Sequence, residues 1–284
     1  MHNEPDQFDM TTDTGRTVED RLAHRIMITV PDRHNPKLHE LIERVNADDD
    51  LYALWTAANV NAIERLEMTD HGPVHVKIVL NIATRLLRLL IDGGIVPGVV
   101  ENYGMEKQDA EVVVALAALL HDLGMSIHRI DHEAYSLFVA QRKLESLLAD
   151  LYPPATAAIV RSEILHAIIS HRTGSQPLTV EAGVVRIADA LDMAKGRSRI
   201  PFEAGSVSIH SVSAAAIEEV KIERGKERPI RIRILMSNSA GVFQLDQLFR
   251  GKLRGSGLEE HIELEAQLSG EGETEKRLFT EFRI

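Results

Sequence analysis

The fold of this chain is decided by residues 112–125, which read VVVALAALLHDLGM. The first nine of these residues are all apolar, a pattern that predicts a helix with no side facing solvent. Such a helix has to be buried, so other helices must surround it. It ends in adjacent His121 and Asp122, and two polar side chains inside a protein need polar partners.

The His-Asp pair on its own is open to two interpretations. Asp122 could lie at the solvent-exposed end of the helix, with His121 as a hydrogen-bonded core residue. Alternatively, both side chains could bind a divalent metal ion, because neutral imidazole and carboxylate are good ligands for such ions. The positions of the other histidines and buried acids favour the metal.

Three further elements supply residues of the same kind. His75 lies in the first turn of a helix predicted to end at Gly93-Gly94, and His171 follows an apolar helical stretch. Asp189 lies inside another predicted helix, in line with Ala182 and Val185. A carboxylate on an apolar helical face costs free energy unless it is paired or metal-bound.

Composition limits the classes of protein. The chain has 284 residues, 44% of them hydrophobic, a formal net charge of −11 and no Cys. Any metal site therefore uses His, Asp, Glu or water. The negative charge argues against a general nucleic-acid binder. Residues 1–20 have no apolar core, and the longest apolar run is far shorter than the ~20 residues that span a bilayer. We expect a cytoplasmic protein with no membrane segment.

Hydrophobic periodicity predicts a mainly α fold in three parts. Residues 1–35 are expected to be an acidic, disordered segment with a short helix near Val18–Met27. Residues 36–200 are expected to be an all-helical domain with the metal site. From about residue 201 the period changes, and Pro229–Ile234 alternates as a half-buried strand does. Residues 201–284 are therefore expected to form a small α+β domain, with a regulatory, substrate-binding or dimerisation role.

The ordered motifs resemble the signature of the HD-domain superfamily of metal-dependent phosphohydrolases. His75, then His121-Asp122, then Asp189 match its H…HD…D pattern. In the dinuclear branch two more histidines lie between HD and the last Asp, and His132 and His171 match them. The resemblance implies that His75, His121, Asp122, His132, His171 and Asp189 bind metal, with Asp122 bridging two ions. Ligands of these types fit Mn, Fe, Mg, Ni or Co.

What the resemblance implies about function is hydrolysis of a phosphoester by metal-activated hydroxide. The substrate expected is a small molecule, either a nucleotide or a cyclic or dinucleotide. Residues 167–174 are similar to the corresponding segment of bacterial diadenosine-tetraphosphate hydrolases of this superfamily. Because the match is local, it implies a metal-binding role for this segment and does not indicate the substrate. Leu123-Gly124-Met125 after HD disfavours the guanosine-tetraphosphate branch, and the GYP motif of the cyclic-di-GMP branch is missing from the sequence. The deoxynucleotide triphosphohydrolase branch also continues its HD motif differently.

Two other functions remain open at this level. Di-iron oxygenases of the same superfamily have the same six ligands, so ligand type does not separate them from hydrolases. A nucleotide sensor without activity could keep the scaffold, although so many inward polar groups would cost it stability.

Several more residues are candidates for roles beside the metal. The catalytic set that we expect is Asp122, His128, Arg172 and Lys195. His128 and His132 are four apart and share a face if that stretch is helical. Asp192 is a candidate for orienting a ligand, and His71 and His166 are weaker candidates for the site. Lys77, Arg129 and Arg197 are near the ligands in sequence and could contact phosphate.

The C-terminal part carries a local excess of basic residues, among them Lys221, Arg231, Arg250 and Lys252. Such a surface could bind nucleotide, RNA or an acidic partner, or could be an ordinary solvated strand face. Exposed strand edges in so small a domain would also favour a homodimer or another homo-oligomer.

Overall fold

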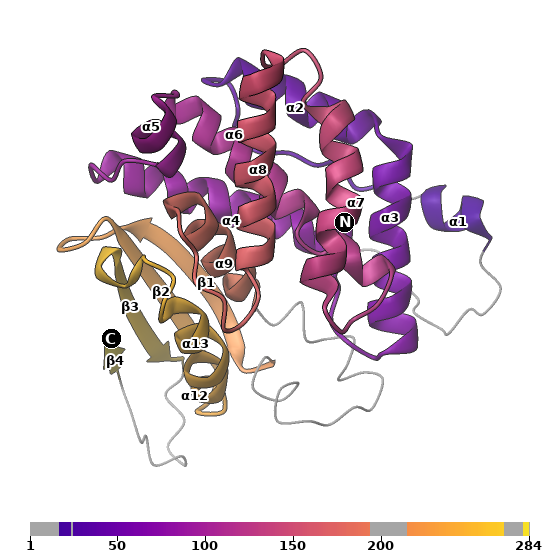
Figure 1. The fold of residues 1–284 in the computed structure, drawn as a ribbon. Helices are drawn as coiled ribbons and strands as arrows, with labels where there is room; N and C mark the ends of the chain where they lie inside the picture. Colours follow the sequence, from indigo (N-terminus) through magenta and orange to yellow (C-terminus); the bar gives the residue numbers. More distant parts are fainter. Residues whose placement is uncertain (1–16, 24, 194–214, 270–280, 284) are drawn as a thin grey trace, which may run out of the picture.

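The computed structural model describes residues 17–23, 25–193, 215–269 and 281–283. Helices make up the described chain as far as Leu191 and a small sheet follows, which confirms the predicted mainly α class with an α+β C-terminal part (Figure 1). The helices of the first part are α1 (Val18–Ala23), α2 (Pro36–Ala47), α3 (Asp49–Asn59), the π-helical turn η1 (Val60–Arg65), α4 (Pro73–Asp92), α5 (Gly98–Tyr103), α6 (Lys107–Leu120), the 3-10 turn η2 (Leu123–Ser126), α7 (His132–Leu147), α8 (Pro154–Ser170) and α9 (Val180–Leu191).

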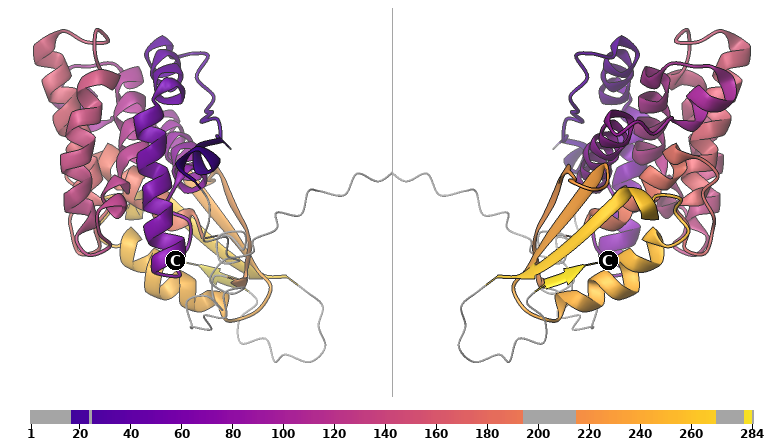
Figure 2. Two further views of the ribbon diagram at one scale, coloured as in Figure 1. Left: turned by 90° about the vertical axis from the view of Figure 1, so that its right-hand side faces the viewer. Right: turned by 90° about the vertical axis from the view of Figure 1, so that its left-hand side faces the viewer.

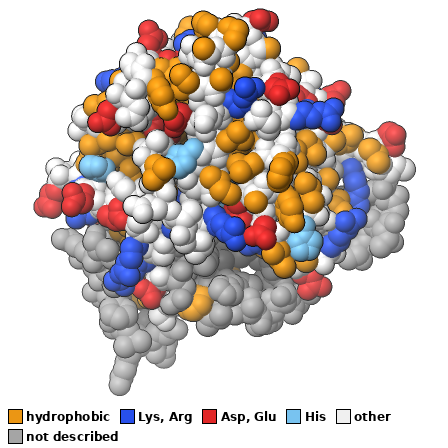
Figure 3. Space-filling view, viewed as in Figure 1, with side chains coloured by type: hydrophobic (Ala, Val, Ile, Leu, Met, Phe, Trp, Pro, Cys, Tyr) orange, Lys and Arg blue, Asp and Glu red, His pale blue; other side chains and the backbone are white. Residues whose placement is uncertain are grey.

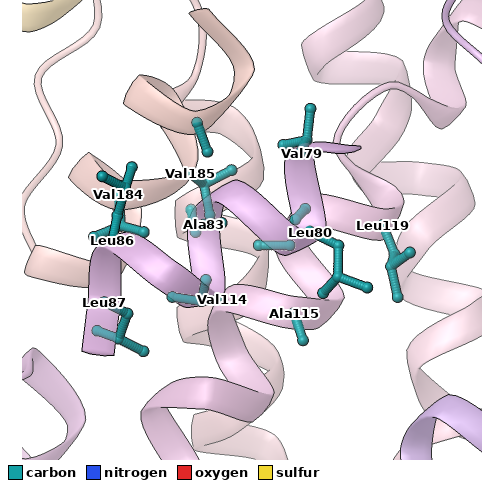
Figure 4. Packing of buried hydrophobic residues seen from close by; sticks show 14 of the residues in the cluster. Val79, Leu80, Ala83, Leu86, Leu87, Val114, Ala115, Leu119, Val184 and Val185 are labelled. Atoms are coloured by element: carbon teal, nitrogen blue, oxygen red, sulfur yellow. The ribbon is translucent and has the colours of Figure 1, made fainter. Parts of the chain in front are cut away.

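The central helix is α6, as its apolar sequence predicts. Every residue from Asp109 to Leu120 is buried, and α4, α8, α9 and α2 pack around the helix. Figure 4 shows how Leu80 and Ala83 of α4 meet Val114 of α6 in this packing. Burial of apolar surface on all sides stabilises the helix, which ends at Leu120, directly before His121.

The C-terminal part is a four-stranded sheet with short helices. Its elements are β1 (Ile217–Arg224), β2 (Ile230–Met236), α12 (Gly241–Phe243), the π-helical turn η3 (Gln244–Phe249), α13 (Arg250–Leu253), the 3-10 turn η4 (Glu259–His261), β3 (Ile262–Leu268) and β4 (Glu281–Arg283). The order is β1-β2-β3-β4, and β2 pairs with β3 in parallel while the outer pairs are antiparallel. A parallel pair needs a crossover, and α12 to α13 provide it.

The sheet part is packed against the helices that carry His75 and Asp189. Strands β1 and β2 contact α4, and η3 and α13 contact α9. A Cβ at Gly183 of α9 would lie 2.4 Å from the carbonyl oxygen of Ser256, so glycine allows a close approach at this interface. Figure 2 shows the sheet beside one end of the helical bundle.

Several sequence expectations can be compared with the described residues. The first helix ends at Ala23, earlier than expected. The stretch between His128 and His132 is not helical, because Asp131 has a positive φ of 58° and α7 begins only at His132. The division at residues 35 and 200 stays a prediction, since residues 1–16 and 194–214 lie outside the described part.

Among the described helices, none is long and apolar enough to cross a membrane.

Candidate metal centre

His75 is fixed in the first turn of α4 by the residues before it. Asp70 Oδ1 accepts hydrogen bonds from the backbone N–H groups of Gly72 and His75, both at 3.0 Å. Pro73 is the first helical residue, where no N–H group is needed. The side chain of His75 is fully buried, so this helix start presents an imidazole to the interior.

The turn after α6 is tied to two other helices. Trp55 Nε1 donates to the carbonyl oxygen of Leu119 at 2.9 Å. Ser136 Oγ of α7 donates to the carbonyl oxygen of His121 at 2.5 Å and accepts from the N–H of Gly124 at 2.8 Å. The His-Asp turn is therefore held against α7, which itself begins with His132.

The remaining two ligand candidates come from α8 and α9. His171 follows the last residue of α8, and Asp189 lies in the last turn of α9. Both turn toward His121: the rings of His121 and His171 have centroids 4.9 Å apart, and Asp189 Oδ1 lies 3.8 Å from His121 Nε2. Five elements thus bring six predicted ligands together.

The four imidazole rings are oriented in the same way. In each ring Nδ1 has a partner and Nε2 faces the cluster. The Nδ1 contacts are His75 with Asp192 Oδ2 (2.6 Å), His121 with the Ala118 carbonyl (2.8 Å), His132 with the Arg129 carbonyl (3.0 Å) and His171 with the Ile168 carbonyl (2.5 Å). A carbonyl oxygen only accepts, so Nδ1 of His121 and of His171 carries a hydrogen and Nε2 is the atom that would bind a cation. Nδ1 of His132 also lies 2.7 Å from Nη1 of Arg129, which only donates, so the carbonyl contact alone does not set the tautomer of this ring.

The carboxylate of Asp122 lies between two pairs of these imidazoles. Its Oδ2 is 3.4 Å from Nε2 of both His75 and His121. Its Oδ1 is 3.2 Å from Nε2 of His132 and 3.7 Å from that of His171. Two groups that could hold a metal ion therefore share Asp122, one with His75 and His121 and one with His132 and His171.

Asp189 lies on the first of these two sides. Its Oδ1 is 3.6 Å from His75 Nε2. The two imidazole nitrogens there, Nε2 of His75 and Nε2 of His121, are only 3.2 Å apart. Two imidazole nitrogens and two carboxylate oxygens this close together repel one another unless a proton or a metal cation lies among them. The donor set thus fits divalent cations, whose identity and number the residues alone do not fix.

The pKa shifts of the clustered residues also indicate that the site attracts positive charge. Burial opposes the charged form of His121, but Asp122 and Asp189 outweigh it and raise the pKa of His121 to about 10. Burial would raise the pKa of Asp122, yet the neighbouring imidazoles, His121 foremost, hold it well below its usual range. Burial likewise opposes ionisation of Asp189, and Lys252 and His121 lower its pKa. Both carboxylates are therefore charged and attract a cation.

Burial lowers the pKa of His171 well below its ordinary value, and the nearby cationic groups His121 and Lys252 lower it further. This imidazole is neutral near pH 7, the form that binds metal.

Two of the other predicted catalytic residues, His128 and Arg172, lie outside this cluster. His128 is exposed, and its Nδ1 accepts a hydrogen bond from the N–H of Ile130 at 3.0 Å. The side chain of Arg172 is 49% exposed and pairs with Asp131 at 2.8 Å. Lys195 lies outside the described residues. Roles for these three residues in catalysis stay predictions.

The weaker histidine candidates have local partners. The ring of His71 lies beside that of His75, with centroids 5.7 Å apart, and its Nδ1 is 2.7 Å from the carbonyl oxygen of Thr69. His166 Nε2 accepts from the N–H of Leu178 at 3.1 Å. His71 is thus next to the cluster, whereas His166 stabilises the loop after α8.

Two of the candidate cations can also be located. Lys77 lines an open groove between α4 and β1, together with Ile78 and Val220. Arg129 Nη1 lies 2.7 Å from His132 Nδ1, beside the cluster. Arg197 lies outside the described residues.

Among the described residues of the C-terminal part, several basic side chains pair with acids. Arg231 and Arg233 of β2 both contact Glu265 of β3, and Arg224 contacts Asp92 of α4 at 3.0 Å. On the face in Figure 3, blue basic side chains are interspersed with red acidic and orange apolar ones. Nucleic-acid binding and homo-oligomerisation stay predictions.

The sequence does not predict that Lys252 lies next to the proposed ligands. Lys252 Nζ of α13 lies 3.3 Å from Asp189 Oδ2. It is 63 residues away from Asp189 in the sequence and belongs to the other part of the fold. The sequence marks it only as one of several basic residues.

Comparison with known proteins gives the family. The family model of the HD domain matches residues 75–194. Uncharacterized protein MJ1020 of Methanocaldococcus jannaschii is 41% identical over 227 residues, which cover 80% of this chain and 86% of that protein. No solved structure matches. The matched region begins at His75 and includes all six clustered residues, and this protein belongs to the HD-domain superfamily.

Proposed function

We propose that this protein is a metal-dependent phosphohydrolase that cleaves a phosphoester of a nucleotide, cyclic nucleotide or dinucleotide. HD domains are in general metal-dependent hydrolases. The observation that carries the proposal for this chain is the shared position of Asp122. One of its oxygens faces His75 and His121, and the other faces His132 and His171.

The proposed ligands divide accordingly. His75, His121 and Asp189 would hold one cation, His132 and His171 a second, and Asp122 both. Bound divalent cations would neutralise negative charge on the phosphoryl oxygens. They would also lower the pKa of water, so that hydroxide is available to attack phosphorus near neutral pH.

The protein residues prepare this site in two ways. Contacts at Nδ1 direct each Nε2 at the cluster, where a divalent cation would replace any proton on that nitrogen. The near-complete burial of the imidazoles excludes bulk water, which strengthens electrostatic interactions inside the site.

The test is elemental analysis of the full chain purified without chelators, together with hydrolysis of bis(p-nitrophenyl) phosphate and a panel of nucleotides. We expect about two equivalents of Mn, Ni, Co or Mg per chain, and loss of both metal and activity in Asp122→Asn. The matched control is Asp92→Asn, because Asp92 is an exposed carboxylate that pairs with Arg224. It should leave metal and activity unchanged.

Two other results would contradict the proposal. Two equivalents of iron with oxygen-dependent turnover and no hydrolysis would favour an oxygenase, since its ligand types are the same. Protein that neither contains nor rebinds metal would favour a nucleotide sensor.

A further inference from the structure

Lys252 lies beside Asp189, the most exposed of the six clustered residues. The side chains of His75 and His121 are 0% exposed and that of Asp122 is 4% exposed. The side chains of Asp189 and Lys252, in contrast, are 18% and 17% exposed. Among the six clustered residues, Asp189 is therefore the most exposed, and Lys252 lies beside it.

The ammonium group is connected directly to the ligands. Lys252 Nζ lies 3.3 Å from Asp189 Oδ2, while the other oxygen of Asp189 faces His75 and His121. Nζ also donates a hydrogen bond to the carbonyl oxygen of His171. An ammonium has three hydrogens to donate. Among the described residues these two partners take two of them, so one hydrogen is available to a ligand.

The backbone of Lys252 is held in place by a buried arginine. Arg186 of α9 is only 2% exposed, and its Nε donates to the carbonyl oxygen of Lys252 at 2.9 Å. Its Nη1 donates to the carbonyl oxygens of Ser175 at 2.6 Å and Arg172 at 3.2 Å. Arg186 thus joins the loop after His171 to α13. Burial of a guanidinium costs free energy, so a cluster of carbonyl acceptors around it indicates a fixed position.

We propose that Lys252 binds a non-bridging oxygen of the substrate's phosphoryl group, so that the C-terminal part completes the active site. This inference rests on the proposed function. An ammonium beside Asp189 adds a positive charge to those of the cations, and negative charge spread over the phosphoryl oxygens in the transition state is stabilised by such groups. When Asp189 also holds a cation, its charge is shared, and a phosphoryl oxygen is the stronger remaining partner for Lys252.

The experiment measures binding of inorganic phosphate to the metal-loaded full chain by isothermal titration calorimetry, with hydrolysis kinetics alongside. Lys252→Met removes the charge, and Lys252→Arg restores it. Arg250→Met is the matched control, because Arg250 is on the same short helix but pairs with Asp246 in solvent. Circular dichroism and metal analysis of each variant show whether fold and metal content are kept.

We expect Lys252→Met to keep its metal and to weaken phosphate affinity about tenfold or more, as loss of a charge-assisted hydrogen bond does. KM should rise and kcat should fall in the same variant. Lys252→Arg should recover most of the affinity, and Arg250→Met should behave as wild type.

Two outcomes would overturn the inference, and they are distinguishable. Unchanged phosphate affinity in metal-loaded Lys252→Met, with wild type binding and hydrolysing normally, defeats this inference alone. The same holds if saturating metal fully restores that variant, because Lys252 would then act only by positioning Asp189. Wild-type protein that binds metal but neither binds phosphate nor hydrolyses phosphoesters defeats the proposed function as well.

Discussion

At the scale of single residues, the site depends on partners that never face the cluster. Asp192 is such a partner, because its Oδ2 lies 2.6 Å from His75 Nδ1 and sets the orientation and tautomer of that imidazole. We predict that Asp192→Asn lowers metal affinity by about tenfold to a hundredfold, the effect usual for carboxylates behind ligating histidines. Competition with a chelator of known affinity measures the change.

The control for this prediction is Asp246→Asn, since Asp246 is a surface carboxylate that pairs with Arg250. Its metal affinity should equal that of wild type. Equal affinity in Asp192→Asn and wild type would show that His75 is oriented without Asp192, or that it is not a ligand.

Three of the six clustered residues could be found from the helical pattern alone, whereas His132 entered as a ligand only through the family resemblance. His75, His121 and Asp189 each lie on a strongly apolar helix, where a polar side chain needs an explanation. His128 shows where spacing fails as a guide. An interval of four residues places two side chains on one face only inside a helix. The positive φ of Asp131 prevents a continuous helix between His128 and His132.

At the scale of elements, the important contact is between the turn after α6 and the start of α7. A Cβ at Gly124 would lie 2.0 Å from the carbonyl oxygen of His132 and 2.6 Å from the N atom of Ser136. Both atoms are backbone, so α7 would have to move. We predict that Gly124→Ala lowers the free energy of unfolding by about 1–3 kcal/mol, as overpacking does, and reduces metal content. Urea unfolding and elemental analysis measure the two effects.

Gly251→Ala is the matched control for Gly124→Ala. A Cβ at Gly251 meets nothing within 4 Å and the residue is in α13, so alanine should be neutral or slightly stabilising. A Gly124→Ala protein as stable as wild type, with full metal content, would show that the two elements can separate without loss of the site.

At the scale of the whole molecule, the sequence predicts the two parts but not how they meet. Alternation in Ile230–Ile234 identifies a strand of the C-terminal part, since a strand's period depends on local residues. The docking of α13 on α9 depends instead on shape and on contacts between distant residues, such as Gly183 with Ser256. That is why Lys252 could be recognised as basic but not as a neighbour of Asp189.

The contribution of the interface between the two parts to stability can be tested by substituting Arg186. Its guanidinium donates to carbonyl oxygens on both sides, at Ser175 and Arg172 after α8 and at Lys252 of α13. We predict that Arg186→Met, which keeps an apolar side chain of similar length, lowers the free energy of unfolding by about 1–3 kcal/mol. The reason is that buried carbonyl groups lose their donor. Chemical denaturation followed by circular dichroism measures the change.

Arg186→Lys separates charge from geometry in the same experiment. A lysine keeps the positive charge but cannot reach several carbonyl groups in a planar fork, so it should recover only part of the lost stability. Arg142→Met, at an exposed position of α7, should change stability by no more than about 0.5 kcal/mol. If Arg186→Met unfolds at the same denaturant concentration as this control, the two parts are held together by their apolar contacts, and the position of Lys252 does not depend on Arg186.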